Sequence, residues 1–185
     1  MICVWQGVRV PPSAVLVVLG GLPGTGKTTI ARGLARALPA LHLRVDTIEQ
    51  VMRDTGITDQ VELTDHGYRV AYGIAVDNLR LGARVVADTV NPIAITREAW
   101  RAAGAAADAR VVEIEVVCTD PDVHRARVTG RQPDIAGLVL PTWQQVVDRH
   151  YEPWTPEPAA RIDTAAGEAA DWVRQALAAI TGQDA

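Results

Sequence analysis

One stretch of the sequence combines residues and spacing suited to binding phosphate. Residues 21–28 fit the pattern GxxxxGK[ST], and Lys27 within them is the only lysine of the chain. Glycines let backbone N–H groups curve around phosphate oxygens, and the N-terminus of a following helix adds positive charge. The lysine can reach the β- and γ-phosphates of a nucleotide, and the hydroxyl of Thr28 can ligate Mg²⁺. The nucleotide-binding residues predicted from this pattern are Gly21, Pro23, Gly24, Thr25, Gly26, Lys27, Thr28 and Thr29.

Two carboxylates each follow an apolar run that is typical of a strand. Asp46 comes after residues 41–45, and Asp88 comes after Val85–Ala87. Because parallel α/β sheets bind ligands at the carboxyl ends of their strands, both carboxylates are expected beside the phosphates. We predict that Asp88 holds Mg²⁺, directly or through water, and that Asp46 accepts the proton of an attacking hydroxyl. The alternatives are that Asp46 only caps the next helix and that Asp88 only forms a turn.

A group of basic residues follows the fourth apolar run. Arg127 and Arg131 are four residues apart, so they share one face of a helix. Two arginines in this position can clamp a departing phosphoryl group, and both are therefore predicted to be catalytic, together with Lys27 and Asp46. Arg125 is predicted as a further nucleotide contact. The alternative is an ordinary, solvated basic helix face.

Five more residues are candidates for contacting an acceptor molecule. Two of them follow Asp46 at helical spacing, two are a tyrosine pair at i and i+4, and one lies in the turn after Asp88. The alternatives are a solvated helix face for the first two and half-buried packing for the tyrosines. The candidates are Glu49, Arg53, Tyr68, Tyr72 and Asn91.

The elements that must position these residues alternate between strand and helix. Short apolar runs predict strands over residues 14–19, 41–45, 84–87, 110–118 and 161–164. Helical spacing, proline and capping signals predict helices over residues 28–38, 46–54, 65–81, 92–103, 120–130, 142–151 and 168–180. Two helix starts are expected to have specific caps: Asp46 for the second helix, and Asp120 before Pro121 for the fifth.

This alternation predicts an α/β fold. We expect a parallel sheet of about five strands in a three-layer sandwich with helices on both faces, because βαβ units cover both sides of a sheet. The whole chain, residues 1–185, is expected to be one domain. Residues 1–12 would be an N-terminal extension, and residues 120–141, approximately, would form a small helical lid.

Composition and charge argue against several classes of protein. Hydrophobic residues make up 48% of the chain, and the net charge of −4 opposes a broad nucleic-acid-binding face. The two cysteines, Cys3 and Cys118, form no metal or disulfide pattern. No run reaches the ~18 apolar residues of a membrane span, and the start of the chain lacks a signal-peptide pattern. We therefore expect a cytoplasmic protein with no membrane partner. The sequence carries no signal for an oligomeric state.

Residues 21–28, Asp46, Asp88 and the later arginines resemble those of the P-loop kinases that act on small molecules and polynucleotide ends. That group includes gluconate kinase, chloramphenicol phosphotransferase, zeta-toxin kinases and 5′-hydroxyl polynucleotide kinase, whose matching strand and turn look like Val86–Pro92. The resemblance follows nearly the whole chain in order, with the phosphate loop as its most specific part. It implies an ATP and Mg²⁺ requirement, a base at Asp46 and lid arginines after the fourth strand. The acid that a motor-type ATPase carries after Asp88 is missing.

Three hypotheses follow. The first is an ATP-dependent kinase that phosphorylates a hydroxyl of a small metabolite or antibiotic. The second is a 5′-hydroxyl nucleic-acid kinase, which the turn at Asp88–Asn91 favours and the acidic net charge opposes. The third is a nucleotide-binding regulatory ATPase that modifies no acceptor.

Overall fold

The computed structural model describes residues 14–56 and 65–182 of the chain. Within them, five strands form one sheet in the order β2-β3-β1-β4-β5, and every neighbouring pair is parallel. The predicted extension over residues 1–12 lies outside the described residues. The strands are β1 (Val15–Gly20), β2 (Leu41–Arg44), β3 (Arg84–Asp88), β4 (Arg110–Val117) and β5 (Ala160–Asp163).

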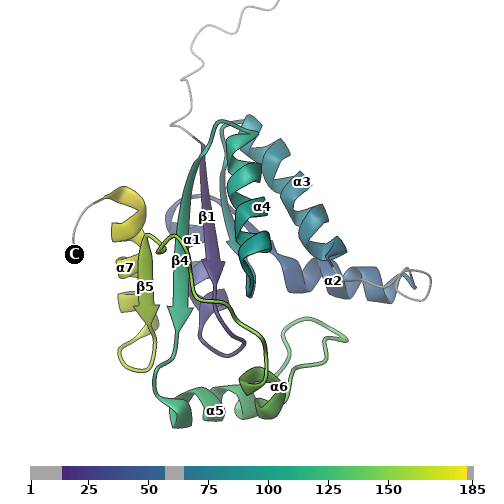
Figure 1. The fold of residues 1–185 in the computed structure, drawn as a ribbon, viewed down its shortest axis with the longest axis vertical. Coiled ribbons are helices and arrows are strands. Elements are labelled where there is room, and N and C mark those ends of the chain that lie inside the picture. Colours follow the sequence, from purple (N-terminus) through teal and green to yellow (C-terminus); the bar gives the residue numbers. More distant parts are fainter. Residues whose placement is uncertain (1–13, 57–64, 183–185) are drawn as a thin grey trace, which may run out of the picture.

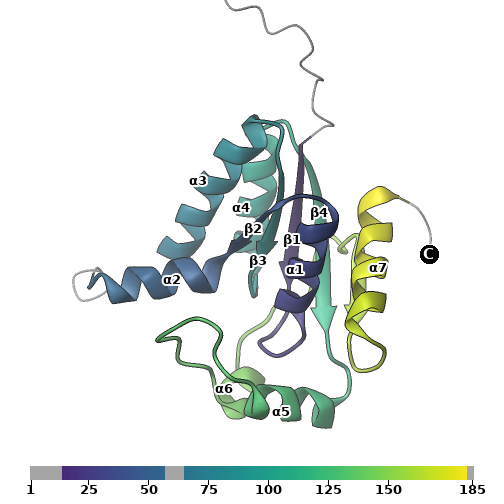
Figure 2. The same ribbon diagram turned by 180° about the vertical axis from the view of Figure 1, so that it is seen from behind.

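Helices cover both faces of this sheet, as the sequence predicts (Figures 1 and 2). The helices of the described residues are α1 (Lys27–Ala37), α2 (Val45–Asp54), α3 (His66–Arg80), α4 (Ala94–Ala105), α5 (Pro121–Gly130), α6 (Trp143–Val147) and α7 (Ala169–Thr181). A three-layer α/β sandwich is therefore confirmed.

The central strand β1 explains why two helical layers are needed. Its side chains alternate between the faces of the sheet, and all of its residues are buried. Val17 and Leu19 belong to a core shared with α1 and α7, whereas Leu16 and Val18 belong to a second core shared with α3 and α4. An uninterrupted apolar strand is stable only when both of its faces are covered.

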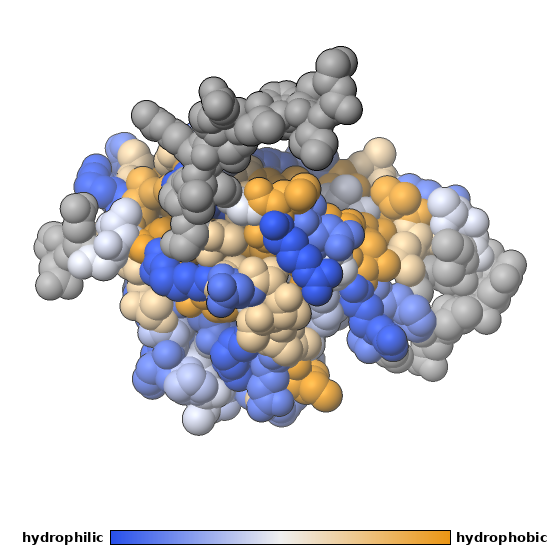
Figure 3. All heavy atoms as spheres, turned by 90° about the horizontal axis from the view of Figure 1, so that it is seen from above, coloured by the Kyte–Doolittle hydropathy of each residue, from blue (hydrophilic) through white to orange (hydrophobic). Residues whose placement is uncertain are grey.

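The helices α5 and α6, with the loop of residues 131–142 between them, lie at the carboxyl ends of the strands (Figures 1 and 2). This loop is called the lid loop below, after the lid predicted over residues 120–141. The predicted cap of α5 is confirmed: Asp120 accepts hydrogen bonds from the backbone N–H groups of Asp122 and Val123, and Pro121 is the first helical residue. At the opposite end of the molecule, hydrophilic and hydrophobic patches alternate over the described surface (Figure 3).

Two predicted helix boundaries are wrong. α2 begins at Val45, so Arg44 is its N-cap and Asp46 lies within the first turn, where its side chain makes no capping hydrogen bond. α6 ends at Val147 instead of continuing to residue 151. Its start is fixed by a capping box in which Thr142 and Gln145 each bond to the other's backbone. Of the residues that follow α6, Arg149 lines the cleft described below.

A buried arginine fixes the segments that follow β3 and α6. Arg97 on α4 has no exposed surface, and its guanidinium donates to the carbonyl oxygens of Asn91, Pro92, Glu152 and Pro153 at 2.7–3.2 Å. The guanidinium also lies 4.3 Å from the centre of the Trp154 ring. One side chain thereby joins the turn after β3 to the connector that leads from α6 to β5.

We expect Arg97→Met to destabilise the protein by about 3 kcal/mol, because several buried carbonyl groups would lose their donors. For a chain of this length, that corresponds to a fall in melting temperature of roughly 6–12 °C. The exposed Arg36→Met is a matched control with an expected loss of less than about 0.5 kcal/mol. Equal melting temperatures for the two variants would show that Arg97 does not stabilise this junction.

Candidate active site

The loop between β1 and α1 has the backbone conformation that phosphate binding requires. Gly24 and Gly26 have φ angles of 86° and 93°, in the left-handed region that side chains disfavour. A Cβ atom at Gly24 would also lie 2.6 Å from Cγ2 of Val128 on α5. The loop therefore needs glycine both for its curvature and for the close approach of α5.

One internal hydrogen bond and contacts from two other segments hold this loop in place. The hydroxyl of Thr25 donates to the Leu22 carbonyl at 2.9 Å, and Thr164 after β5 donates to the Thr25 carbonyl at 2.9 Å. His124 on α5 lies with its Nε2 atom 2.8 Å from the Pro23 carbonyl oxygen. His124 thus supports the loop.

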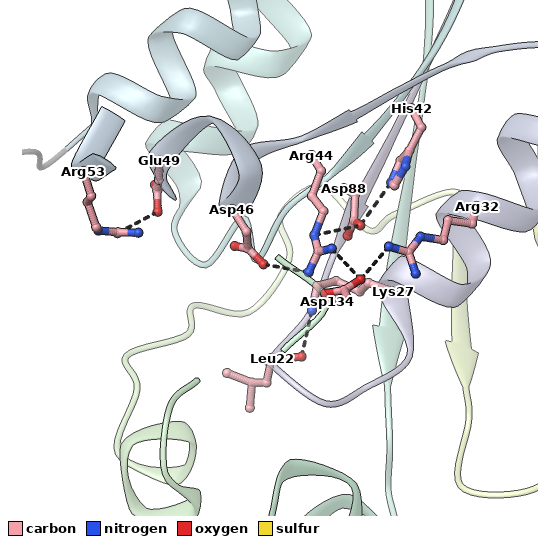
Figure 4. Close-up of polar contacts among 10 residues, drawn as sticks. All are labelled: Leu22, Lys27, Arg32, His42, Arg44, Asp46, Glu49, Arg53, Asp88 and Asp134. Atoms are coloured by element: carbon pink, nitrogen blue, oxygen red, sulfur yellow. Dashed lines mark hydrogen bonds and ion pairs between the residues drawn. The ribbon is translucent and has the colours of Figure 1, made fainter. Parts of the chain in front are cut away.

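Lys27 points into the centre of the site. Its Nζ atom donates to the Leu22 carbonyl at 2.8 Å (Figure 4). Burial lowers the pKa of Lys27 to about 8, although the charges of Asp88 and Asp46 oppose this shift. Arg131 and Arg149 also lower the pKa of Lys27. A phosphate that approaches this lysine would restore its preference for the charged form.

Asp88, at the end of β3, is buried behind Lys27. Its Oδ2 atom lies 3.2 Å from Nε2 of His42 (Figure 4). Burial would raise the pKa of Asp88, but the hydrogen bond from His42, the charge of Lys27 and the hydrogen bond from Thr28 together lower it. Asp88 is therefore an anion held against the hydroxyl of Thr28.

This pair of oxygen ligands fits Mg²⁺. Mg²⁺ in nucleotide sites takes one or two protein oxygens and completes its shell with phosphates and water. In the described residues there is no group of three or more His, Cys, Asp or Glu side chains that could form an all-protein metal site. The hydroxyl of Thr28 and the carboxylate of Asp88 would be suited to hold the ion, and their role as Mg²⁺ ligands stays a prediction.

Asp46 lies on the other side of Arg44 from Asp88. The Oδ2 atom of Asp46 is 3.6 Å from Nη2 of Arg44, and its side chain is 41% exposed (Figure 4). One turn further along α2, Glu49 pairs with Arg53 at 3.3 Å, and burial raises the pKa of Glu49. All of these side chains line one cleft. Asp46, Glu49 and Arg53 thus form the wall of the cleft along α2.

The structure separates the other acceptor candidates. Tyr68 lines the cleft, and its hydroxyl accepts from the Thr89 hydroxyl at 2.5 Å and from the Asn91 backbone N–H at 3.0 Å. Tyr72 instead packs edge-on against Trp100, and Asn91 is fully buried; neither side chain lines the cleft. Tyr72 therefore follows the packing alternative, because its ring completes the core under α3 and α4.

The arginines of α5 also differ from one another. Arg127 donates to the hydroxyl and carbonyl oxygens of Thr164 at 2.8 Å and lies over the ring of Trp172. This places it at the edge of the cleft near β5. Arg125 is exposed and does not line the cleft. Arg131 also lines the cleft, and its charge lowers the pKa of Lys27 in the phosphate loop. The role of Arg127 and Arg131 as a phosphoryl clamp stays a prediction.

Sequence reasoning missed five charged or titratable residues of the site. Arg32 on α1, Arg44 and the lid-loop residue Asp134 form a charged cluster beside Lys27 (Figure 4). His42 approaches Asp88 from β2. Arg149 lies in the segment after α6, and its charge lowers the pKa of both Lys27 and Glu49. The position of Arg44 at a strand end was a usable signal. The others converge on the site only through folding.

The cleft at the carboxyl ends of the strands has a volume of about 1390 Å³. It runs from Trp172 and Arg127 on the β5 side, past the phosphate loop, to α2 and the lid loop. Seven basic and four acidic residues line it, although the whole chain has a net charge of −4. The positive charge of this protein is thus concentrated where phosphates would bind.

This fold and loop define a P-loop kinase-type nucleotide-binding protein, and comparisons with known proteins agree. The chain matches the family described as AAA domain over residues 16–153, and it belongs to that family. An uncharacterized protein of Mycobacterium tuberculosis (strain H37Rv) is 41% identical over 63 residues, which are 33% of this chain and 13% of that protein. The chain thus spans a small part of the length of this curated relative.

Solved kinases share the fold. A gluconokinase from Sinorhizobium meliloti 1021 superposes with a TM-score of 0.63 at 19% identity, covering 94% of each chain. The APS kinase of Mycobacterium tuberculosis in complex with AMPPNP and APS gives 0.65 at 18% identity, covering 92% of this chain and 99% of that one. A sugar kinase from Janibacter sp. HTCC2649 gives 0.66 at 18% identity, covering 92% and 95%. Among the helices of the described residues, none has the length and apolar character needed to cross a membrane.

Proposed function

We propose that this protein transfers the γ-phosphate of Mg-ATP to a hydroxyl group of a small molecule. The observation that carries the proposal is the arrangement of Lys27, Asp88 and Asp46 along one cleft that also extends beyond the phosphate loop to α2 and Tyr68. The part of the cleft beside α2 and Tyr68 would give an acceptor access to the γ-phosphate, at the position called the transfer centre below. The fold shared with a gluconokinase, an APS kinase and a sugar kinase supports this proposal.

The donor nucleotide would lie along the β1 and β5 side of the cleft. The phosphate loop and Lys27 would hold the β- and γ-phosphates. Trp172, Arg127 and Thr164 stand beyond the loop, toward β5, where the nucleoside would bind. Mg²⁺ held by Thr28 and Asp88 would neutralise charge on the phosphates.

The acceptor hydroxyl would approach from the α2 side. Asp46 would accept its proton while the oxygen attacks the γ-phosphorus and the bond to the β-phosphate oxygen breaks. Arg131, with Lys27, would stabilise the charge on the transferred group. Arg149 lines the same cleft and its charge lowers the pKa of both Lys27 and Glu49, so it would lie near the acceptor. Catalysis would then depend on positioning and electrostatics.

The experiment that tests this proposal is an acceptor screen. The full chain would be incubated with Mg-ATP and a library of sugars, sugar acids, nucleosides, antibiotics and 5′-hydroxyl oligonucleotides, and products would be detected by a mass increase of one phosphate. We expect a small-molecule product that disappears with Lys27→Met. Phosphorylation of oligonucleotides alone would favour a nucleic-acid kinase. Nucleotide binding with no phosphorylated product would contradict the kinase proposal.

A further inference from the structure

One lid carboxylate joins two arginines from different elements. The Oδ2 atom of Asp134 accepts hydrogen bonds from Nη1 of Arg44 at 2.9 Å and from Nη2 of Arg32 at 2.5 Å (Figure 4). Arg32 lies on α1, five residues after Lys27, and Arg44 is the last residue of β2. A single carboxylate oxygen therefore occupies the point where two guanidinium groups converge.

The Arg44 guanidinium has donors that the protein does not satisfy. Its side chain is 6% exposed, and both Nε and Nη2 are buried without a hydrogen-bond partner. The carboxylate oxygens facing them belong to Asp88, at 3.9 Å, and Asp46, at 3.6 Å. Buried donors left unpaired carry a free-energy cost, so a ligand that supplied further oxygens here would be bound favourably.

The carboxylate of Asp134 can be replaced more easily than the arginines can move. Asp134 belongs to the lid loop, and its side chain is 36% exposed. Arg44 is instead buried at the end of strand β2 of the sheet. The pair between Arg32 and Asp134 is exposed on both sides, at 46% and 36%, so it contributes little net stability. The planar fork of an arginine matches the oxygens of carboxylate and phosphate groups, and sulfate is tetrahedral like phosphate. Another anion can therefore take the position that Asp134 holds.

The order of the strands shows which substrate such an anion belongs to. The phosphate loop follows β1, and Arg127, Thr164 and Trp172 mark the nucleoside side toward β5. Arg44 ends β2, the strand at the opposite edge of the sheet and beyond the strand that carries Asp88. An anion held by Arg32 and Arg44 would lie on the acceptor side of the transfer centre.

We propose that Arg32 and Arg44 form an anion subsite for the acceptor, and that Asp134 fills this subsite until the acceptor binds. The acceptor is then a hydroxylated molecule that also carries a carboxylate, sulfate or phosphate group. This inference rests on the proposed kinase function, and it adds a substrate class. Asp134 acts as an internal stand-in for the charged group of the substrate and releases the lid loop when it is displaced.

The test uses inorganic sulfate as the probe and calorimetric titration of the full chain. The protein is first saturated with Mg²⁺ and a non-hydrolysable ATP analogue, which fills the phosphate loop, including the γ-phosphate position. We expect Asp134→Ala to bind sulfate about tenfold more tightly than the wild type, because the competing carboxylate is gone. Adding Arg32→Gln to that variant is expected to reverse the gain, whereas the exposed Arg36→Gln is expected to leave it unchanged. Melting temperatures confirm that each variant is folded.

Two results would overturn the inference. One is an unchanged sulfate affinity in Asp134→Ala. The other is sulfate binding that occurs with Mg-ADP but not with the ATP analogue, which would assign the arginines to the transferred phosphate. None of these titrations depends on phosphoryl transfer. If sulfate binding is enhanced but no acceptor is phosphorylated, the anion subsite is supported and the proposed kinase function is contradicted. If an uncharged acceptor is phosphorylated rapidly, the kinase function is supported and the proposal of an anionic substrate is contradicted.

Discussion

Replacing Asp46 by asparagine is expected to slow phosphoryl transfer about a thousandfold, because the variant has no general base for the acceptor hydroxyl. The side chain keeps its size, and its polar contact in the described residues is with Arg44 and not with the phosphate loop, so nucleotide affinity is expected to change by less than about threefold. The measurements are kcat with the acceptor found by the screen and calorimetric titration of a non-hydrolysable ATP analogue.

The control for this change lies on the same helix. Asp54→Asn near the end of α2 keeps an oxygen that can accept the hydrogen bond from Gln50, which measures 2.8 Å, and it is expected to behave as the wild type. Equal rates for Asp46→Asn and Asp54→Asn would refute the assignment of the base.

Glu49 is the rival base, since it lines the same wall one turn away. Burial raises its pKa above the ordinary value of a glutamate. If Glu49 were the base, transfer would decline as the pH falls through that raised pKa, and Glu49→Gln would show the large loss instead of Asp46→Asn. With Asp46 as the base, Glu49→Gln is expected to alter KM for the acceptor more than kcat.

Replacing Lys27 by methionine is expected to reduce kcat about 10²–10³-fold, because a charged donor aimed at the transferred group is removed from a water-poor site. The variant should fold, since Lys27 is buried and methionine has a similar length without a charge to desolvate. A retained melting temperature together with lost transfer is the expected combination. Retention of kcat within about threefold would exclude Lys27 from the transfer step.

The same residue predicts a pH dependence of nucleotide binding. In the free protein burial sets the pKa of Lys27 at about 8, below the ordinary value of 10.5, whereas bound phosphates favour the charged form. Above about pH 8 the free protein has lost this proton, so binding must take it up, and the affinity is expected to fall by up to about tenfold per pH unit.

This dependence can be measured by titrating Mg-ADP between pH 7.5 and 9.5 in buffers of different ionisation enthalpy, which also reports proton uptake. Lys27→Met is the matched control, and its weaker binding is expected to be independent of pH over this range. A wild-type affinity that stays constant to pH 9.5 would show that Lys27 does not titrate in the free site.

The sequence alone determined the layers of the fold and the phosphate loop. Continuous apolar runs such as β1 can be stable only when both faces are covered, so the parallel sheet with helices on each side follows from local pattern. The phosphate loop is likewise local, because Gly24, Gly26, Lys27 and Thr28 act through consecutive backbone and side-chain positions. Asp88 followed from the rule that ligands gather at strand ends.

Only the tertiary structure decided which residues meet on the α2 side of the cleft. Arg32, Arg44 and Asp134 come from α1, β2 and the lid loop, and no spacing in the sequence relates them. Arg127 and Arg131 look equivalent in the sequence, but the contact with Thr164 takes Arg127 toward β5. The physical reason is that charged residues far apart in the sequence can pair only where the loops at the end of the sheet bring them together. The positions of these loops depend on contacts such as those of Arg97 and His124, which join segments far apart in the chain.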